Sequence, residues 1–153
     1  MASLHGNSVN TIRVTTYTCK GKSHIISCAL RIGAKDSCTD NYDAGGYFAA
    51  VDIETGVVTT PCFKDFKAFI YHPDNGTKIT GFQIPFWKEA VEMVDVCCKE
   101  VPGARYVGWD VAILKDGPCL IEGNTGNNAY RILQSADGVG KWETIRRIRR
   151  MHD

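Results

Sequence analysis

The sequence predicts an α+β fold, a largely antiparallel sheet with packed helices, and two observations carry this prediction. Short stretches rich in β-branched and apolar residues alternate with tight turn sequences, which is typical of strands joined in hairpins. One longer segment instead repeats its apolar residues at helical spacing. Strands in hairpins around one strong helix favour α+β over an alternating βαβ order. The predicted strands are residues 11–19, 24–32, 47–53, 57–60, 106–114 and 119–123.

The strongest predicted helix begins at Pro85, a residue type that suits a first helical turn. Pro102 and Gly103 end the segment. Apolar residues between them follow the i, i+3, i+4, i+7 pattern of one buried stripe. These residues are Trp87, Ala90, Val91, Val94, Cys97, Cys98 and Val101. We expect the whole stripe, Cys97 included, to be buried against the sheet.

The length and net charge of the chain limit the classes of function that it can have. The 153 residues fit a single domain over residues 1–153, and a net charge of +1 gives no whole-chain field for nucleic acid. We expect residues 1–9 to be flexible and residues 141–153 to form a basic terminal helix. Its arginines are interpreted as a solvated helix face, because no aromatic stacking partners or known module accompany them. No nucleic-acid partner is therefore expected.

The cysteines and the hydropathy pattern indicate a cytoplasmic protein. Seven cysteines occur without any Cys-x-x-Cys spacing, so buried free thiols are favoured over a disulfide framework or a zinc site. No apolar run approaches the roughly 20 residues of a membrane span. Residues 1–10 lack the layout of a signal peptide.

Three oxygen-bearing side chains near the last predicted hairpin are candidate metal ligands. Glu122 and Asn124 lie two apart on a strand and so share a face, and Asp110 lies on the preceding strand. Hard cations such as Mg²⁺ prefer oxygen ligands and leave positions for phosphate oxygens. The structural alternative is a hairpin whose polar residues merely sit at a sheet end.

The shared site depends on the hairpin register. A regular two-residue turn would place Asp110 opposite Gly123 and turn it away from Glu122. A three-residue loop at residues 115–117 would pair Asp110 with Glu122 and set Ile121 in the core. We therefore expect an odd-length loop or a bulge, with the two carboxylates close together.

Further segments, taken with this hairpin, resemble the sugar-transfer-associated ATP-grasp group, which is similar to glutamate-ligase-like members. The resemblance spans about residues 8–128 and corresponds to the C-terminal half of an ATP-grasp domain. The order and spacing of the segments are more specific than any one of them. They are Ser8-Val9-Asn10-Thr11-Ile12-Arg13, Arg31, Asn41-Tyr42-Asp43-Ala44-Gly45-Gly46, His72-Pro73-Asp74, Ile84-Pro85-Phe86-Trp87 and Gly108-Trp109-Asp110.

The resemblance implies a role for each candidate residue. Asp110, Glu122 and Asn124 would be the metal ligands for two Mg²⁺ ions, with ATP as the substrate. Catalytic arginines would be Arg13 and Arg31, because guanidinium groups match phosphate oxygens; the alternative for each is an ion-pair role. The loop residues Asn41, Gly45 and Gly46 would bind near the phosphates or the acceptor, or form an ordinary turn.

The implied activity is the ATP-dependent ligation of a carboxylate to an amine or similar nucleophile through an acyl phosphate, associated with cell-surface polysaccharide. Gly108 stands where some relatives carry an arginine, and the ATP-contacting N-terminal half is expected upstream as a missing partner. One alternative is a non-catalytic binding module derived from the ligase fold. Another is a protein of a hexapeptide-type sugar acyltransferase pathway, although six-residue repeats are not found.

Overall fold

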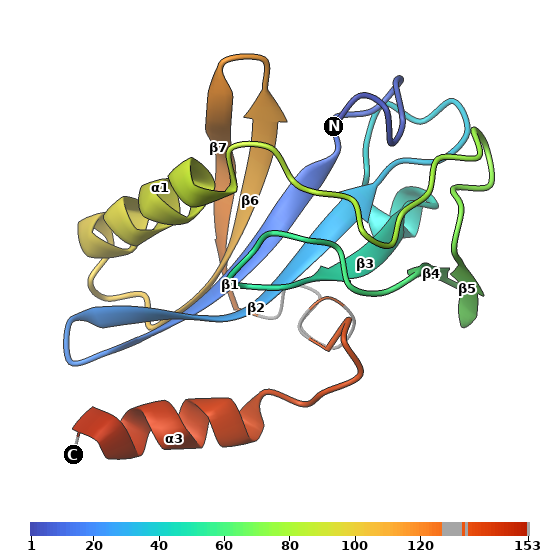
Figure 1. Cartoon of the computed structure of the whole chain (residues 1–153). Coiled ribbons are helices and arrows are strands. Elements are labelled where there is room, and N and C mark those ends of the chain that lie inside the picture. Colours follow the sequence, from blue (N-terminus) through green and yellow to red (C-terminus); the bar gives the residue numbers. More distant parts are fainter. Residues whose placement is uncertain (127–132, 134, 153) are drawn as a thin grey trace.

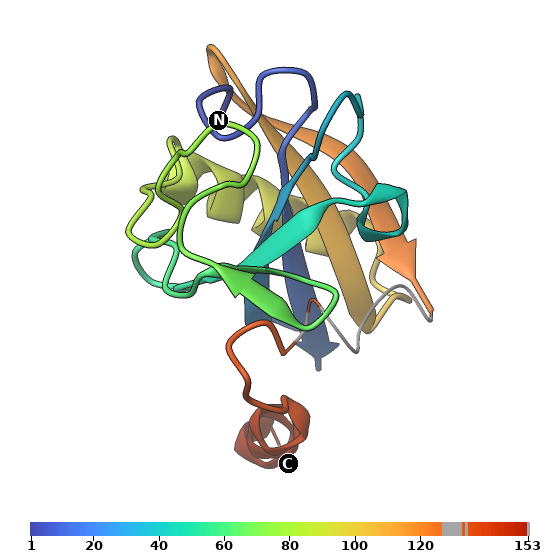
Figure 2. The ribbon, with the colours of Figure 1, turned by 90° about the vertical axis from the view of Figure 1, so that its right-hand side faces the viewer.

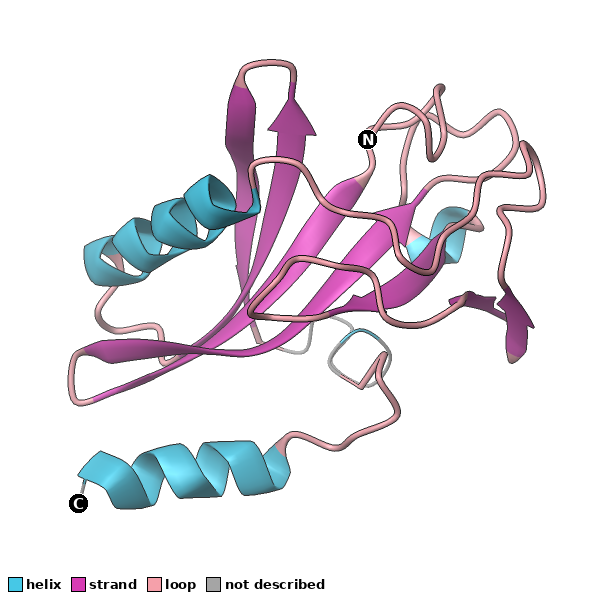
Figure 3. Ribbon diagram, viewed as in Figure 1, coloured by secondary structure: helices cyan, strands magenta, loops and turns pink. Residues whose placement is uncertain are grey.

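The computed structural model describes residues 1–126, 133 and 135–152 and contains a seven-stranded sheet in the order β5-β4-β3-β2-β1-β6-β7 (Figure 1). All paired strands run antiparallel, and Figure 3 shows the two longer helices beside the sheet. The strands are β1 Thr11–Cys19, β2 Lys22–Ile32, β3 Tyr47–Val51, β4 Cys62–Lys64, β5 Lys67–Phe69, β6 Tyr106–Leu114 and β7 Gly117–Thr125. The helices are η1 Tyr42–Ala44, α1 Trp87–Glu100 and α3 Trp142–His152.

The predicted α+β class and most of the predicted elements are confirmed. The basic terminal helix is α3, and the predicted strand at residues 57–60 forms only isolated bridges to Val51 and Gln83. The β4–β5 hairpin was not predicted, because strands of three residues carry too little alternation to be recognised. Within the described residues, no helix is both long and apolar enough to cross a membrane.

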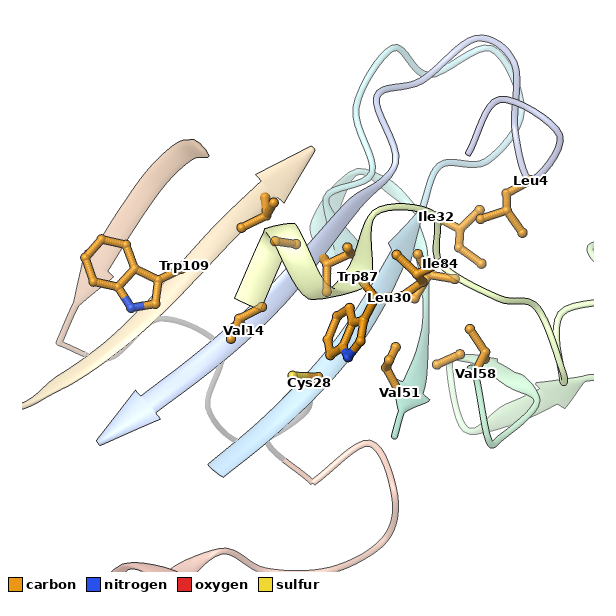
Figure 4. Close-up of a cluster of buried hydrophobic side chains, with 14 of the residues drawn as sticks. Leu4, Val14, Cys28, Leu30, Ile32, Val51, Val58, Ile84, Trp87 and Trp109 are labelled. Atoms are coloured by element: carbon orange, nitrogen blue, oxygen red, sulfur yellow. The ribbon is translucent and has the colours of Figure 1, made fainter. Parts of the chain in front are cut away.

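One face of the sheet carries the main hydrophobic core. Val14 of β1, Leu30 of β2 and Trp109 of β6 point into it from neighbouring strands (Figure 4). Trp87 of α1 and Ile84 before it close the same core. Arg13 precedes Val14 and Asp110 follows Trp109, so these two charged side chains point to the opposite face of the sheet, which also carries smaller apolar clusters.

The two longer helices contact opposite faces. Cys98 of α1 lies 3.5 Å from the Thr16 hydroxyl, whereas Arg149 of α3 donates to the hydroxyl of Tyr17, the next residue of β1, at 2.8 Å. Consecutive strand residues point to opposite faces. Ile145 and Ile148 of α3 form a small second cluster with Tyr17. Figure 2 shows α3 end-on and set apart from the core side.

The buried stripe of α1 is narrower than predicted. Ala90, Val94 and Cys98 are buried together with Trp87. Cys97 is only partly buried and Val101 is exposed, so the prediction that both are fully buried is wrong. The helix turns by about 100° per residue, so Cys97 and Cys98 cannot both face the sheet directly.

The N-terminal segment before β1 packs against the domain. Leu4 is fully buried, and its carbonyl oxygen accepts a hydrogen bond from the Asn75 amide at 2.7 Å. The Asn10 amide also donates to the carbonyl oxygen of His5 at 2.9 Å. The expected flexibility of residues 1–9 stays a prediction.

The β6–β7 hairpin has a two-residue turn and a bulge. Leu114 pairs with Gly117, so the turn has two residues, and of the two expected alternatives the bulge occurs and the odd-length loop does not. The register then shifts by one residue between Val111 and Asp110, which leaves Asp110 paired with Glu122 as expected. Ile121 is the extra residue and is 55% exposed rather than part of the core.

We predict that Cys98→Asp lowers the free energy of unfolding by more than about 3 kcal/mol, because it places an unpaired charge in an apolar site. Cys97→Asp is the matched control, since its partly exposed carboxylate can reach water. Thermal and denaturant unfolding of both variants checks the difference. Equal losses of stability would contradict the assignment of Cys98 as the buried position.

Candidate active site

The polar face of the central strands brings most of the predicted site residues together. Arg13 of β1 pairs in register with Asp110 of β6, and Asp110 pairs with Glu122 of β7. Ala29 of β2 pairs with Arg13, so Arg31, two residues further along, lies on the same face. Four adjacent strands thus contribute one row of charged side chains.

Asp110 is the centre of this row. Its Oδ2 atom accepts hydrogen bonds from Arg13 Nη2 at 2.9 Å and from Arg31 Nη1 at 2.6 Å, and Arg13 Nε donates to Oδ1. Asp110 is 3% exposed and Arg13 is 7% exposed. Ion pairs held so far from water are only weakly screened by salt, and each charge needs its partners to remain buried.

A second carboxylate, Asp40, completes the buried network and was missed by the sequence analysis. Its Oδ1 lies 3.1 Å from Arg31 Nη2, and its Oδ2 accepts from the backbone nitrogen of Thr11 at 2.7 Å and from the Thr11 hydroxyl. Two arginines therefore face two buried carboxylates. The only available signal was the concentration of Asp and Asn in the polar loop before β3, which does not distinguish Asp40 from its neighbours.

The loop at residues 41–46 explains how Asp40 is positioned. The Asn41 carbonyl oxygen accepts from the backbone nitrogens of Ala44 and Gly46, both at 3.0 Å. Gly45 has φ of 97°, and a Cβ on Gly46 would lie 2.4 Å from the carbonyl oxygen of Asp40. The glycines thus let the chain fold back onto Asp40. A contact of Asn41, Gly45 or Gly46 with phosphate or acceptor stays a prediction.

The space over Gly108 is filled by the side chain of Arg13, which leaves little room for an arginine at position 108. A Cβ at Gly108 would lie 3.0 Å from Arg13 Cδ and 3.3 Å from Arg13 Nη1. The side chain of Arg13 therefore passes over Gly108 from the neighbouring strand. The positive charge at this place comes from β1 instead of β6.

Glu122 and Asn124 form the outer part of the site. The Asn124 side-chain nitrogen donates to Glu122 Oε1 at 3.0 Å, and Glu122 is exposed to solvent. This bond leaves the amide oxygen of Asn124 available as an acceptor. The bulge at Ile121 sets both side chains on the face that carries Asp110.

The three candidate ligands can bind a hard cation only if the carboxylate oxygens of Asp110 contact the cation and the two arginines at the same time. Asp110, Glu122 and Asn124 all present oxygen atoms, the ligands that Mg²⁺ prefers. The Asp110 carboxylate already accepts from both arginines, and a carboxylate offers about four lone-pair positions. Within the described part of the chain, no group of three or more His, Cys, Asp and Glu side chains is gathered for a metal. The expected two-ion site stays a prediction.

Comparison with known proteins places the chain in a family. A search of curated proteins found no significant match, and neither did a search of solved structures. A family model described as sugar-transfer associated ATP-grasp matches residues 1–150, which is most of the chain. This agrees with the resemblance in the sequence motifs and with the α+β fold. The chain belongs to the sugar-transfer-associated ATP-grasp family.

Proposed function

We propose that this chain is the metal-binding half of an ATP- and Mg²⁺-dependent carboxylate ligase. ATP would phosphorylate a carboxylate, and an amine or similar nucleophile would attack the acyl phosphate. The observation that carries the proposal is the buried Arg13–Asp110–Arg31 cluster beside exposed Glu122 and half-buried Asn124 on one sheet face. Work on cell-surface polysaccharide or a related precursor rests on the family description alone.

The arginines suit the charge changes of phosphoryl transfer. Each guanidinium carries five N–H donors, and the carboxylates of Asp110 and Asp40 use only some of those on Arg31. The remaining donors can neutralise charge that develops on a transferring phosphoryl group. The ion pairs fix both side chains beforehand, so little ordering is needed when substrate binds.

Glu122, Asn124 and Asp110 would hold the magnesium. The ion would screen the negative charge of the triphosphate. Glu122 is exposed, and within the part of the chain that the structure describes its hydrogen bond is to the nearby Asn124, so its carboxylate can turn toward an ion without breaking the buried network. Most of the ATP contacts would come from other parts of an ATP-grasp fold.

One observation favours the alternative of a non-catalytic binding module. The Asp110 carboxylate is already neutralised by two arginines, which would be sufficient reason to keep it in a structural role. The two candidates differ in whether Glu122 matters for ATP turnover. In a binding module, Glu122 is an ordinary exposed residue.

We predict that Glu122→Gln, assayed in an active protein that includes the ATP-contacting half of an ATP-grasp fold, lowers kcat by at least about 100-fold while leaving the melting temperature nearly unchanged. The amide keeps the size of the side chain but removes the charge that would hold the cation. ADP release in the presence of Mg²⁺ measures turnover, and thermal unfolding measures stability. Glu100→Gln on α1 is the control, since Glu100 is also exposed. Unchanged turnover in Glu122→Gln would favour the binding module.

Asp110 should behave differently from Glu122. We predict that Asp110→Asn lowers the free energy of unfolding by about 3 kcal/mol, because two largely buried arginines lose their shared counter-charge. Asp95→Asn on α1, which breaks a half-exposed pair with Lys99, should cost less than about 1 kcal/mol. Denaturant unfolding of both variants makes the comparison. A negligible loss for Asp110→Asn would show that the cluster does not stabilise the fold.

A further inference from the structure

An open cleft of about 470 Å³ lies where the η1 loop meets the β4–β5 hairpin, and Ser135, Ala136 and Gly138 of the segment before α3 also line it. Four aromatic residues line it: Tyr42, Phe48, Phe63 and Phe66. The ring of Phe48 contacts both Tyr42, with centroids 5.8 Å apart, and Phe63, at 5.7 Å. The backbone nitrogen of Asp65 donates to the Tyr42 hydroxyl at 3.3 Å, which ties the hairpin turn to the loop.

The backbone conformation at the tip of the β4–β5 hairpin is energetically unfavourable. Asp65 and Phe66 both have left-handed φ angles, of 48° and 62°, although neither is glycine. The Phe66 ring is fully exposed, so its burial does not offset this cost. A two-residue turn of this kind favours glycine at the second position. An exposed aromatic ring held in a strained conformation indicates a role other than stability.

The cleft adjoins the charged cluster. Phe48 of β3 pairs in register with Arg31 of β2, and directly opposed side chains in an antiparallel pair lie about 5 Å apart at Cβ. Lys64 also lines the cleft, and its ammonium group lies 5.3 Å from the centre of the Tyr47 ring. Tyr47 belongs to the main core, so the Lys64 ammonium is directed away from the face that carries Phe48 and Arg31. The acidic Asp65 also lines the cleft. The cleft is thus apolar in its walls and meets Arg31 along the sheet face.

We propose that this cleft is a subsite for a substrate that carries an aromatic or similarly apolar ring together with a carboxylate. The ring would stack among Phe48, Phe63 and Phe66, and the carboxylate would point along the sheet face toward Arg31. Offset and edge-to-face packing suits aromatic rings. The term substrate rests on the proposed ligase function, whereas binding in the cleft does not require it.

Ligand binding to the purified 153-residue chain tests the subsite without ATP. The probe is 3-phenylpropionate, with propionate as the control that lacks the ring and 3-phenylpropanol as the control that lacks the charge. Calorimetry or NMR titration should give about tenfold tighter binding for 3-phenylpropionate than for propionate. 3-Phenylpropanol should bind severalfold more weakly than 3-phenylpropionate, because it lacks the charge that would meet Arg31. Equal affinities for 3-phenylpropionate and propionate would overturn the proposal.

Phe66→Gly separates binding from folding. We expect this variant to raise the melting temperature by about 3 °C, because glycine relieves the left-handed strain, and to weaken 3-phenylpropionate binding about fivefold. Phe66→Tyr should keep the binding. Leu114→Ser, which alters an exposed apolar residue beside the β6–β7 turn on the opposite edge of the sheet, should leave it unchanged.

Two other outcomes would overturn the subsite. A lower melting temperature for Phe66→Gly would make the ring structural. A change in oligomeric state at unchanged probe affinity would make Phe66 a protein–protein contact. These results are distinct from a failure of the ligase function, which is judged by the Glu122→Gln turnover: the cleft can bind the probe in a chain that lacks ligase chemistry.

Discussion

The buried ion pairs around Asp110 are the constraint on which the rest of the polar face depends. They join three adjacent strands, since Arg31 comes from β2, Arg13 from β1 and Asp110 from β6. Removing a charged group from water is costly unless its partners are in place. The network therefore fixes the register of these strands on the polar face, as the apolar core does on the other.

The same constraint explains several local features. Asp40 must reach Arg31, and the glycine-containing loop folds back to allow it. Gly108 must lack a side chain because Arg13 passes over it. Asp110 must face Arg13, and the bulge at Ile121 then brings Glu122 beside it. Features that look unrelated in the sequence thus serve one cluster.

This arrangement gives the polar face a rigid part and an adaptable part. The arginines and Asp110 are held by several hydrogen bonds each, whereas Glu122 is exposed and its partner among the described residues is the nearby Asn124. In the proposed ligase, a fixed positive centre would meet the phosphoryl group while the outer carboxylate adjusts to a cation. The aromatic cleft beside Phe48 extends the same face toward β4 and β5.

The sequence by itself determined the α+β class, the limits of β1 and most of α1, because these follow from local periodicity and turn chemistry. It also indicated that Asp110, Glu122 and Asn124 share a face. Only the tertiary structure decided that a bulge rather than a longer loop sets this register, that Cys98 rather than Cys97 is buried, and that Asp40 joins the site. The position of the bulge, the orientation of α1 about its axis and the path of the loop that carries Asp40 depend on contacts between distant segments. No local sequence pattern encodes those contacts.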